Sequence, residues 1–275
     1  VSGNHQVLRV DTESSQDISK EIEKKIFNKF VSLLKQTNIV VISDYRKGML
    51  TKNLLSKIIK TAKEKKKIVI VDPKNRDFGI YSNANIITPN LKELFEATDT
   101  KSLSSNLLIE KLSKKIINLY GFETVITTRS SDGISLVDNK SKSIHLPSKA
   151  KEVFDVSGAG DTVVSYIASG IAQKLDLINS VELANEAAGI AVSKFGTVAI
   201  SIEEVEEKKN KASKICTLNQ ILREKKEKKY RRIGFTNGCF DLLHQGHIDY
   251  LKKSREMCDY LILALNSDSS IKKIK

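Results

Sequence analysis

Short runs of β-branched and other apolar residues alternate with amphipathic stretches along the first two thirds of the chain. Residues 39–44 (IVVISD) predict a buried strand, and residues 51–65 then place their apolar side chains at helical spacing. The same reading predicts further strands at residues 68–72, 85–88, 124–128, 134–137 and 143–146, and helices at residues 91–97, 106–120, 161–173 and 180–195. This alternation predicts an α/β fold with an open, mostly parallel sheet covered on both faces. Such sheets bind ligands at the carboxyl ends of their strands.

The pattern changes near residue 202. Residues 203–214 (EEVEEKKNKASK) are highly charged, residues 217–229 predict one more charged helix, and a fresh strand is predicted at residues 232–236. A helix through Ile248, Tyr250 and Leu251 and a strand at residues 260–264 follow. We therefore expect a first domain at residues 1–203, a charged linker and helix at 204–229, and a second domain at 230–275.

Composition is that of an ordinary globular protein, with 40% hydrophobic and 29% charged residues in 275. No apolar run approaches the roughly 18 residues that a membrane span needs, and the polar residues 1–10 do not resemble a signal peptide. The three cysteines, Cys216, Cys239 and Cys258, fit neither a disulfide framework nor a CxxC metal site. We expect reduced thiols, a cytoplasmic location and no membrane partner.

The formal net charge of +13 arises from 46 basic and 33 acidic residues. Such a balance is compatible with a nucleic-acid or anionic-surface binder, and a salt-dependent shift of plain duplex DNA would identify one. Here lysine is spread along the whole chain, and few aromatic residues lie near the densest basic run, residues 223–232. We interpret that run as a solvated helix and linker, with a phosphate-steering role as the alternative, and expect no nucleic-acid partner.

A glycine-rich segment, residues 155–162 (DVSGAGDT), precedes a long apolar helix. The amides of Gly158, Ala159 and Gly160 would point out of the helix N-terminus, where the helix dipole favours an anion. Asp161 at the mouth of this anion hole can accept the proton of an attacking hydroxyl. The alternative is that Asp161 only caps the helix and the glycines only form a turn.

The longer string, residues 153–162 (VFDVSGAGDT), resembles the signature of the ribokinase-like (PfkB) carbohydrate kinases. The resemblance implies an incomplete three-layer α/β/α domain that uses ATP with Mg²⁺ and acts as a homodimer. It assigns nucleotide contacts to a TPNLKE segment, a TTRSSDG loop and a later helix. In the TTRSSDG loop, Ser130 stands where many members have glycine. The residues concerned are Asn90, Leu91, Lys92 and Glu93 (Asn90 and Glu93 organising Mg²⁺ and phosphates through water), Thr128, Arg129 and Gly133, and Asn185. A helix cap remains the alternative for Asn90, and plain helix surface for Asn185.

A sugar site is predicted after the first strand. Asp44 lies at the strand's carboxyl end, where it can bind a sugar hydroxyl, and Lys47 can meet a sugar phosphate. Together with residues 4–11 (NHQVLRVD), this segment resembles one subfamily, the bifunctional heptose-7-phosphate kinase and heptose-1-phosphate adenylyltransferase of Gram-negative bacteria. The resemblance covers essentially the whole chain and adds Asn4 to the substrate contacts.

The second domain begins with a strand that leads into HQGH. His244 and His247 stand beside a helix N-terminus, where they can hydrogen-bond ATP phosphates and stabilise departing pyrophosphate. A metal site is the alternative, although no Cys pair or third His accompanies them. The string resembles the cytidylyltransferase-like nucleotidyltransferases, and the resemblance assigns nucleotide contacts to Thr236, Asn237, Gly238, Phe240 and Lys275, with Lys272 as the next match after Lys275.

The resemblance implies ATP-dependent phosphorylation of D-glycero-β-D-manno-heptose 7-phosphate at C1, then adenylyl transfer that gives ADP-heptose for the lipopolysaccharide core. The alternative is a kinase of another sugar joined to a CTP-using cytidylyltransferase, which only substrate assays separate. The first third of a usual kinase and the later part of a usual nucleotidyltransferase have no counterpart here, so we expect a piece of a longer enzyme.

Overall fold

The computed structural model describes residues 14–101, 104–141, 143–150, 152–212, 216, 218, 221–222, 230, 232–240 and 242–266. The chain divides into two compact units, residues 1–207 and 208–275. The predicted site residues Asn4 and Lys275 and most of the predicted helix at 217–229 lie outside the described residues.

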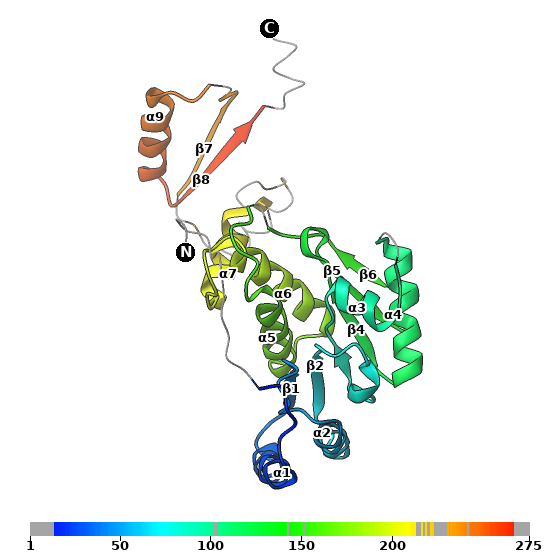
Figure 1. The fold of residues 1–275 in the computed structure, drawn as a ribbon. Helices are drawn as coiled ribbons and strands as arrows, with labels where there is room; N and C mark the ends of the chain where they lie inside the picture. The colour runs from blue at the N-terminus through cyan, green and yellow to red at the C-terminus, as the bar shows by residue number, and fades with distance from the viewer. Residues whose placement is uncertain are drawn as a thin grey trace. The chain divides into compact units, whose positions relative to one another are not determined.

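A six-stranded sheet forms the centre of the first unit, in the order β1-β2-β3-β4-β5-β6 (Figure 1). Strands β1 to β4 are parallel, and β5 and β6 are added antiparallel as a hairpin on β4. The bounds are β1 (Ile39–Ser43), β2 (Ile68–Asp72), β3 (Ile86–Ile87), β4 (Thr124–Thr128), β5 (Ile134–Asp138) and β6 (Ile144–Leu146). The predicted mostly parallel sheet and hairpin are confirmed.

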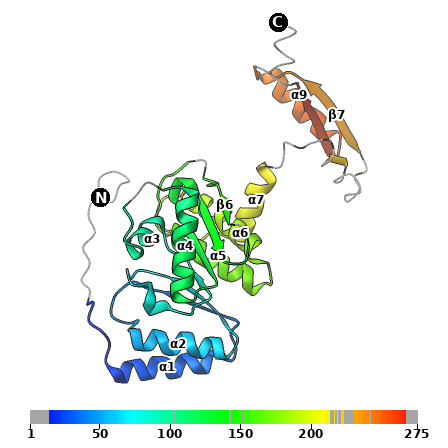
Figure 2. The same cartoon turned by 90° about the vertical axis from the view of Figure 1, so that its right-hand side faces the viewer.

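Helices cover both faces of this sheet, because successive strand side chains point to opposite sides. Val69 and Val71 of β2 enter one core with the apolar faces of the helices that follow β1 and β3, whereas Ile70 enters a second core beneath two later helices. On the first face lie α1 (Lys20–Leu34), α2 (Lys52–Glu64), the 3₁₀ turn η1 (Phe78–Tyr81), α3 (Leu91–Ala97) and α4 (Asn106–Tyr120), and on the second lie α5 (Ala159–Ala172) and α6 (Leu177–Ala191). The result is the predicted three-layer α/β/α architecture, in which α1 lies beside α2 and α5 beside α6 (Figures 1 and 2).

Helix α1 is the longest element of the described part of this unit that the sequence pattern did not predict. Its apolar side chains Ile26, Phe27 and Phe30 pack only partly buried against the first core, among many lysines and glutamates. Asn53 of α2 donates a 2.6 Å hydrogen bond to Glu23 of α1. The thin apolar stripe explains why the helix was missed: it covers the core from outside and does not form its centre.

The second unit contains β7 (Ile233–Gly238), α9 (Gln245–Glu256) and β8 (Tyr260–Leu265), with β7 and β8 parallel. No residue of α9 is buried, and Phe235 and Leu265 expose most of their side chains. The charged stretch before this unit holds α7 (Ile202–Ala212), whose Val205 packs against Ala187 and Ile190. Among the described residues, no helix is both long and apolar enough to cross a membrane.

Candidate active site

The carboxyl ends of three parallel strands meet the start of α5 around a cavity of about 210 Å³. Asp72 ends β2, and Asp44 directly follows β1. Asn90 caps α3 three residues after the end of β3, and Asp161 lies in the first turn of α5. All four line the cavity. The arrangement follows from topology, because parallel strands place their carboxyl ends at one edge of the sheet.

The start of α5 is shaped by its glycines. Gly158 caps the helix with φ = 76°, a left-handed conformation that favours glycine, and an added Cβ would lie 2.8 Å from Cγ2 of Thr197. A Cβ added to Gly160, by contrast, would meet no described atom within 4 Å. Gly158 therefore serves the turn, and Gly160 keeps open the space in front of the helix.

Most of the amides at this helix start are available to a ligand. The Ala159 amide donates to the Val156 carbonyl at 3.3 Å, but no described residue accepts a hydrogen bond from the amides of Gly158, Gly160 or Asp161. Unpaired amides at a helix N-terminus form an anion site. The amides of Gly158, Gly160 and Asp161 are thus the ones without a described acceptor, whereas that of Ala159, which was also predicted for the anion hole, is partnered.

Asp72 is a cleft residue that the sequence analysis missed. Burial, followed by the negative charges of Glu93 and Asp161, raises the pKa of the Asp72 carboxyl to about 6. The sequence could have predicted its position, because Asp72 ends the predicted strand IVIVD and directly precedes Pro73. The negative charges of Glu93 and Asp161 beside a buried Asp72 create a place where a cation is favoured.

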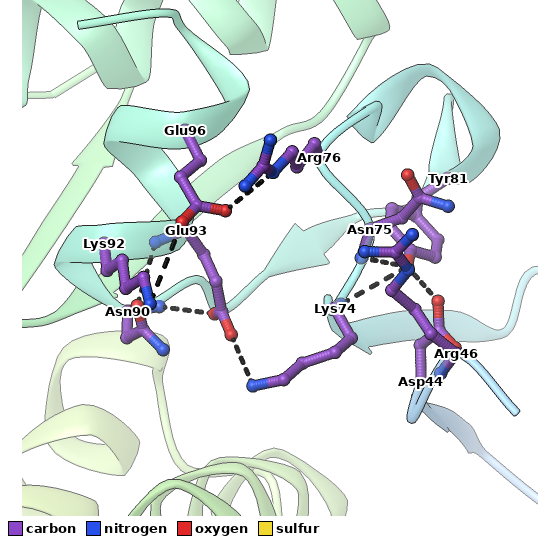
Figure 3. Close-up of polar contacts among 10 residues, drawn as sticks. All are labelled: Asp44, Arg46, Lys74, Asn75, Arg76, Tyr81, Asn90, Lys92, Glu93 and Glu96. Atoms are coloured by element: carbon purple, nitrogen blue, oxygen red, sulfur yellow. Dashed lines mark hydrogen bonds and ion pairs between the residues drawn. The ribbon is translucent and has the colours of Figure 1, made fainter.

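Asn90 and Glu93 form a capping box at the start of α3. The Glu93 amide donates to Asn90 Oδ1 and the Asn90 amide donates to Glu93 Oε2, both at 2.9 Å. The other Glu93 oxygen, Oε1, accepts a hydrogen bond from Nζ of Lys74 at 3.0 Å (Figure 3). The helix-cap alternative for Asn90 is therefore real, and the cap also fixes the Glu93 carboxylate at the wall of the cleft.

A second cavity, of about 390 Å³, joins the small one through Thr128, Gly160 and Val163. Its walls are largely apolar, as suits a flat heteroaromatic ring. The lining residues include the predicted nucleotide contacts Thr128, Gly133 and Asn185 together with Ser130, Ile134, Val153, Val156, Ala188 and Val192. Three predicted contacts thus lie at one cavity next to the start of α5.

The loop at residues 127–133 has a serine, Ser130, where related sequences were expected to have glycine. Ser130 has φ = 52°, which explains why glycine is favoured at this position. Arg129 lies outside both cavities: its guanidinium donates to Asn106 Oδ1 at 2.8 Å and to Ser135 Oγ at 3.1 Å. The prediction that Arg129 contacts the nucleotide gains no support from this geometry, because the side chain ties the loop to its neighbours.

Leu91 and Lys92 do not line the apolar cavity. They line a shallow depression that also includes Thr128 and Ser130. The Lys92 ammonium is largely exposed and stands 3.9 Å from Glu96. Their position borders the nucleotide cavity but does not enter it.

Asp44 anchors the turn that follows β2. Its Oδ2 accepts a hydrogen bond from the hydroxyl of Tyr81, and the same hydroxyl accepts from the amides of Lys74 and Asn75 at 3.4 and 3.3 Å. Its Oδ1 accepts from the Arg46 amide at 2.8 Å (Figure 3). Burial raises the pKa of the Tyr81 hydroxyl well above its ordinary value, which keeps it a donor to Asp44. A sugar hydroxyl bound at Asp44 would therefore share carboxylate oxygens that already accept hydrogen bonds from Tyr81 and Arg46.

Tyr45, the residue after Asp44, lines the catalytic cavity, and Lys47 lies nearby in the sequence. The Tyr45 hydroxyl donates to Asp161 Oδ1 at 3.4 Å, and Lys47 lines a wide basic cavity on the same side. Tyr45 thereby connects the predicted sugar side to the predicted base.

The second unit brings its predicted residues together where β7 leads into α9. Thr236, Asn237 and Gly238 end β7, and the Thr236 hydroxyl lies 2.6 Å from that of Tyr250. A Cβ on Gly238 would lie 2.5 Å from the ring of Phe240, whose own φ is 47°. The turn after β7 is therefore tight and depends on glycine.

The two histidines stack on each other at the start of α9. Their ring centroids lie 3.8 Å apart, and Phe240 meets the His247 ring edge-on at 5.1 Å. Nδ1 of His247 is buried with no hydrogen-bond partner among the described residues. No group of three or more His, Cys, Asp or Glu side chains able to hold a metal occurs in the described ranges, so the metal alternative gains no support.

Comparison with known proteins matches both units. Residues 3–204 match the family model described as pfkB family carbohydrate kinase, and residues 235–275 match the one described as Cytidylyltransferase-like. Bifunctional protein HldE of Paramagnetospirillum magneticum is 39% identical over 283 residues, which cover 100% of this chain and 58% of that protein. Its namesake in Campylobacter jejuni subsp. doylei is 41% identical over 274 residues, 99% of this chain and 58% of that protein. The chain thus spans about 58% of the length of these relatives.

Solved structures show the same fold at low identity. Phosphofructokinase-2 from Escherichia coli, crystallised in complex with potassium, aligns with a TM-score of 0.62 at 19% identity over 70% of this chain and 62% of that one. Ribokinase from Giardia lamblia aligns with a TM-score of 0.60 at 21% identity over 69% and 64%. The first unit therefore has the predicted ribokinase-like fold.

Proposed function

The chain belongs to the pfkB family of carbohydrate kinases, and on this premise we propose that its first unit transfers the γ-phosphoryl group of ATP to a sugar hydroxyl. One observation carries the proposal: Asp161 lies in one small cavity with the unpaired amides at the start of α5 and the carboxylates of Asp72 and Glu93. A proton acceptor, an anion site and a cation site within one cleft are what phosphoryl transfer requires.

The proposed reaction breaks the bond between the γ-phosphorus and the β–γ bridging oxygen and forms one to the sugar oxygen. Asp161 accepts the hydroxyl proton as the new bond forms. The amides of Gly158 and Gly160 donate to the oxygens of the transferred group, and ADP leaves with the electron pair of the broken bond. The Tyr45 hydroxyl, 3.4 Å from Asp161 Oδ1, orients the acceptor carboxylate.

Mg²⁺ fits the carboxylate wall of this cleft. Glu93 and Asp161 add to the burial that raises the pKa of Asp72, and a divalent cation would relieve this repulsion on Asp72. Within the described residues no three-ligand cluster forms a cage, which suits an ion held by one or two carboxylates together with water and substrate phosphates. When bound, Mg²⁺ would neutralise charge on the phosphates.

The proposed acceptor is D-glycero-β-D-manno-heptose 7-phosphate, phosphorylated at C1. Support comes from relatives named Bifunctional protein HldE, which match this chain from end to end at about 40% identity. The second unit would then transfer an adenylyl group from ATP to heptose 1-phosphate and release pyrophosphate, giving ADP-heptose for the lipopolysaccharide core. His244 and His247 would stabilise the charge on the departing group.

A CTP-using second unit joined to a kinase of another sugar is the second candidate. The match of residues 235–275 to the family model described as Cytidylyltransferase-like is the observation that supports this second candidate. Adenylyl and cytidylyl transfer differ only in the nucleoside, so ATP and CTP tested side by side separate them. We further propose a cytoplasmic homodimer, since ATP and sugar phosphates are cytoplasmic metabolites and a tetrameric form of phosphofructokinase-2 shows that this fold assembles.

The test is Asp161→Asn in the full-length protein, which keeps the size of the side chain but removes the proton acceptor. ATP-dependent phosphorylation of heptose 7-phosphate should fall by at least about 10³-fold, within the range attributed to general bases. Adenylyl transfer to heptose 1-phosphate should be unchanged. A variant that still phosphorylates the sugar at the wild-type rate would remove Asp161 from the reaction.

A further inference from the structure

A nearly buried arginine, Arg129, directly follows β4 and lies outside both cavities of the catalytic cleft. Its side chain is 9% exposed, and its Nε is buried with no hydrogen-bond partner among the described residues. Asp132, the carboxylate that pairs with it in the described part of the chain, is 3.6 Å away and 56% exposed. Burying a charge without full pairing is costly, so an apolar side chain would serve folding at least as well. The arginine therefore needs a reason other than the stability of the fold.

The Arg129 guanidinium donates hydrogen bonds to two other elements. Its Nη1 donates to Oδ1 of Asn106, the first residue of α4, at 2.8 Å and to Oγ of Ser135 in β5 at 3.1 Å. Ser135 is fully buried on the α4 side of the sheet, because its neighbours Ile134 and Leu136 enter the core beneath α5 and α6. Directional bonds thus tie Arg129 to a helix and a strand that flank its own loop.

His145 of β6 is the next member of this chain of hydrogen bonds. It lies directly opposite Ser135 in the β5–β6 pair, and its Nδ1 is 2.8 Å from Ser135 Oγ. Because an arginine only donates, Ser135 Oγ accepts from Arg129 and gives its own single proton to His145 Nδ1. Burial, followed by the positive charge of Arg129, lowers the pKa of His145, which favours the neutral imidazole that this order requires. The direction of the chain is therefore fixed from Arg129 through Ser135 to His145.

One end of the chain lies in the loop between β4 and β5, residues 129–133, which reaches the apolar cavity. Ser130, Ser131 and Gly133 of this loop line that cavity. Gly133 has φ = 88°, and a Cβ added there would lie 2.0 Å from the carbonyl oxygen of Leu146 at the end of β6. The loop is thus packed backbone to backbone against the end of β6.

The other end of the chain lies on β6, whose continuation lines the same cavity. Ser148 and Ala150 are lining residues, and the carbonyl of Pro147 accepts a 2.8 Å hydrogen bond from Nδ2 of Asn185, which lines the cavity from α6. His145 stands two residues before Pro147. The hydrogen-bond chain therefore joins the two segments that together form one wall of the apolar cavity.

We propose that Arg129 is a positioning residue for the nucleotide: through Ser135 and His145 it holds the loop at 129–133 and the end of β6 together as a preformed wall of the apolar cavity. The inference rests on the proposed kinase function and deepens it. The guanidinium does not touch the ligand but keeps the loop in the position that binds it. Apparent affinity falls with the fraction of molecules in which that position is populated. Loss of Arg129 therefore weakens ATP binding and leaves the chemistry at Asp161 unchanged.

The experiment compares Arg129→Met and Arg129→Lys with wild type in the full-length protein, with ATP and heptose 7-phosphate as substrates. Methionine has no donor, so the KM for ATP should rise at least about fivefold, as for binding that must first order a short loop. The kcat and the KM for the sugar should stay within about twofold. Lysine keeps the charge but lacks the guanidinium fork, so Arg129→Lys should show nearly the same rise. A direct contact between the charge and a nucleotide phosphate would instead be largely preserved by lysine.

Ser135→Ala breaks the same chain at a residue that lines neither cavity. It should also raise the KM for ATP, and combining it with Arg129→Met should add little, because both remove one connection. Ser180→Ala is the matched control. Ser180 is likewise fully buried, and its hydroxyl donates to the carbonyl of Asp176 at 2.8 Å, away from both cavities. Its melting temperature should fall about as far as that of Ser135→Ala, with the KM for ATP at the wild-type value.

Hydrogen exchange at residues 129–133 and 147–150, with and without ATP, reads this wall directly and does not depend on the sugar or on the second unit. In wild type, ATP should slow exchange in both segments, and in Arg129→Met exchange should be faster without ATP and less protected with it. Should Arg129→Met fold poorly, Arg129→Lys and Ser135→Ala carry the same comparison.

The outcomes separate the proposals. A rise in the KM for ATP in Arg129→Met, Arg129→Lys and Ser135→Ala that is absent from Ser180→Ala supports the positioning role. An unchanged KM for ATP in Arg129→Met, or full rescue by lysine, overturns it while leaving the kinase function intact. If wild type phosphorylates no sugar tested, the proposed function fails and hydrogen exchange decides: ATP protection of both segments that Arg129→Met loses supports the positioning role, and equal exchange in both proteins overturns it.

Discussion

Lys74 Nζ lies 3.0 Å from Glu93 Oε1, and both charges act on the neighbouring carboxyl of Asp72 in opposite directions. Burial is the largest cause of the raised pKa of Asp72, Glu93 raises it further, and Lys74 lowers it. Even with this ion pair beside it, the carboxyl group of Asp72 is therefore costly to ionise unless a further cation binds. This cost is measurable as a dependence of stability on pH.

Asp72→Asn should stabilise the ligand-free protein at neutral pH. The folded protein holds the Asp72 proton up to about pH 6, whereas the unfolded chain releases it near 3.8. Raising the pH across this window therefore lowers stability, by at most about 3 kcal/mol at full effect. Asparagine does not ionise, so the gain should be complete above pH 6 and absent below about pH 4. Thermal melts between pH 4 and 8 measure it.

The same variant should lose kinase activity, since an amide is a weaker partner for Mg²⁺ than a carboxylate. A higher melting temperature together with an at least about tenfold lower kcat would show that the Asp72 carboxylate lowers the stability of the protein but is needed for activity. If Asp72→Asn is less stable than wild type at pH 7, the raised pKa is wrong.

Gly160→Ala should separate binding from folding at the start of α5. The new Cβ would meet no described atom within 4 Å, and alanine favours a helix by about 1 kcal/mol over glycine, so stability should hold or rise. The methyl group would occupy the space in front of the unpaired amides. We expect the KM for ATP to rise or kcat to fall by at least about tenfold, measured by ADP release alongside thermal melts.

Gly170→Ala, in the same helix, is the opposite case and serves as the control. A Cβ there would lie 2.6 Å from Ser180 Oγ and 3.2 Å from its Cα, so α5 and α6 would have to separate. We expect a loss of about 1–3 kcal/mol in the free energy of unfolding, as for overpacking, with kinetic constants close to wild type while the protein is folded. Equal activity losses in both glycine variants would mean that helix packing, and not the anion site, accounts for the effect at Gly160.

Tyr81→Phe should weaken the turn that carries Lys74. It removes the hydroxyl that donates to Asp44 and accepts from two amides, and leaves Asp44 Oδ2 buried without that partner. The expected cost is about 1–3 kcal/mol, read from urea denaturation. Tyr120→Phe removes a hydroxyl for which the described residues show no hydrogen bond, and should change stability by less than about 0.5 kcal/mol. Similar losses in both variants would contradict the role given to the Tyr81 hydroxyl.

The sequence predicted what depends on periodicity and on strand ends. The alternation of apolar runs was sufficient for the three-layer fold, because each buried strand and each amphipathic helix has its own repeat. Asp44, Asn90 and Asp161 could be placed in one cleft because each sits next to a strand end or a helix start. Asp72 has the same kind of position and was missed because no surrounding motif drew attention to it.

What could not be predicted depends on side-chain direction. Arg129 lies in the expected loop, yet its guanidinium points to Asn106 and Ser135, which come from other elements. The gathering of Arg46, Lys74 and Arg76 around one opening likewise depends on the turns after β1 and β2. Helix α1 escaped prediction because its apolar stripe is only half-buried.

His247→Asn should abolish nucleotidyl transfer and leave the kinase untouched. The buried Nδ1 of His247 has no described partner, and the ring is held between His244 and Phe240 at the start of α9, so its imidazole is fixed in direction without a structural hydrogen bond to lose at Nδ1. We expect folding to be nearly unaffected and transfer of the nucleotidyl group to heptose 1-phosphate to fall by at least about 10²-fold, as for loss of a preorganised donor to a developing anion. Pyrophosphate release measures the transfer with ATP and CTP in parallel, and ADP release measures the kinase on the same preparation. A variant that loses both activities, or neither, would contradict the assignment of His247 to the second reaction.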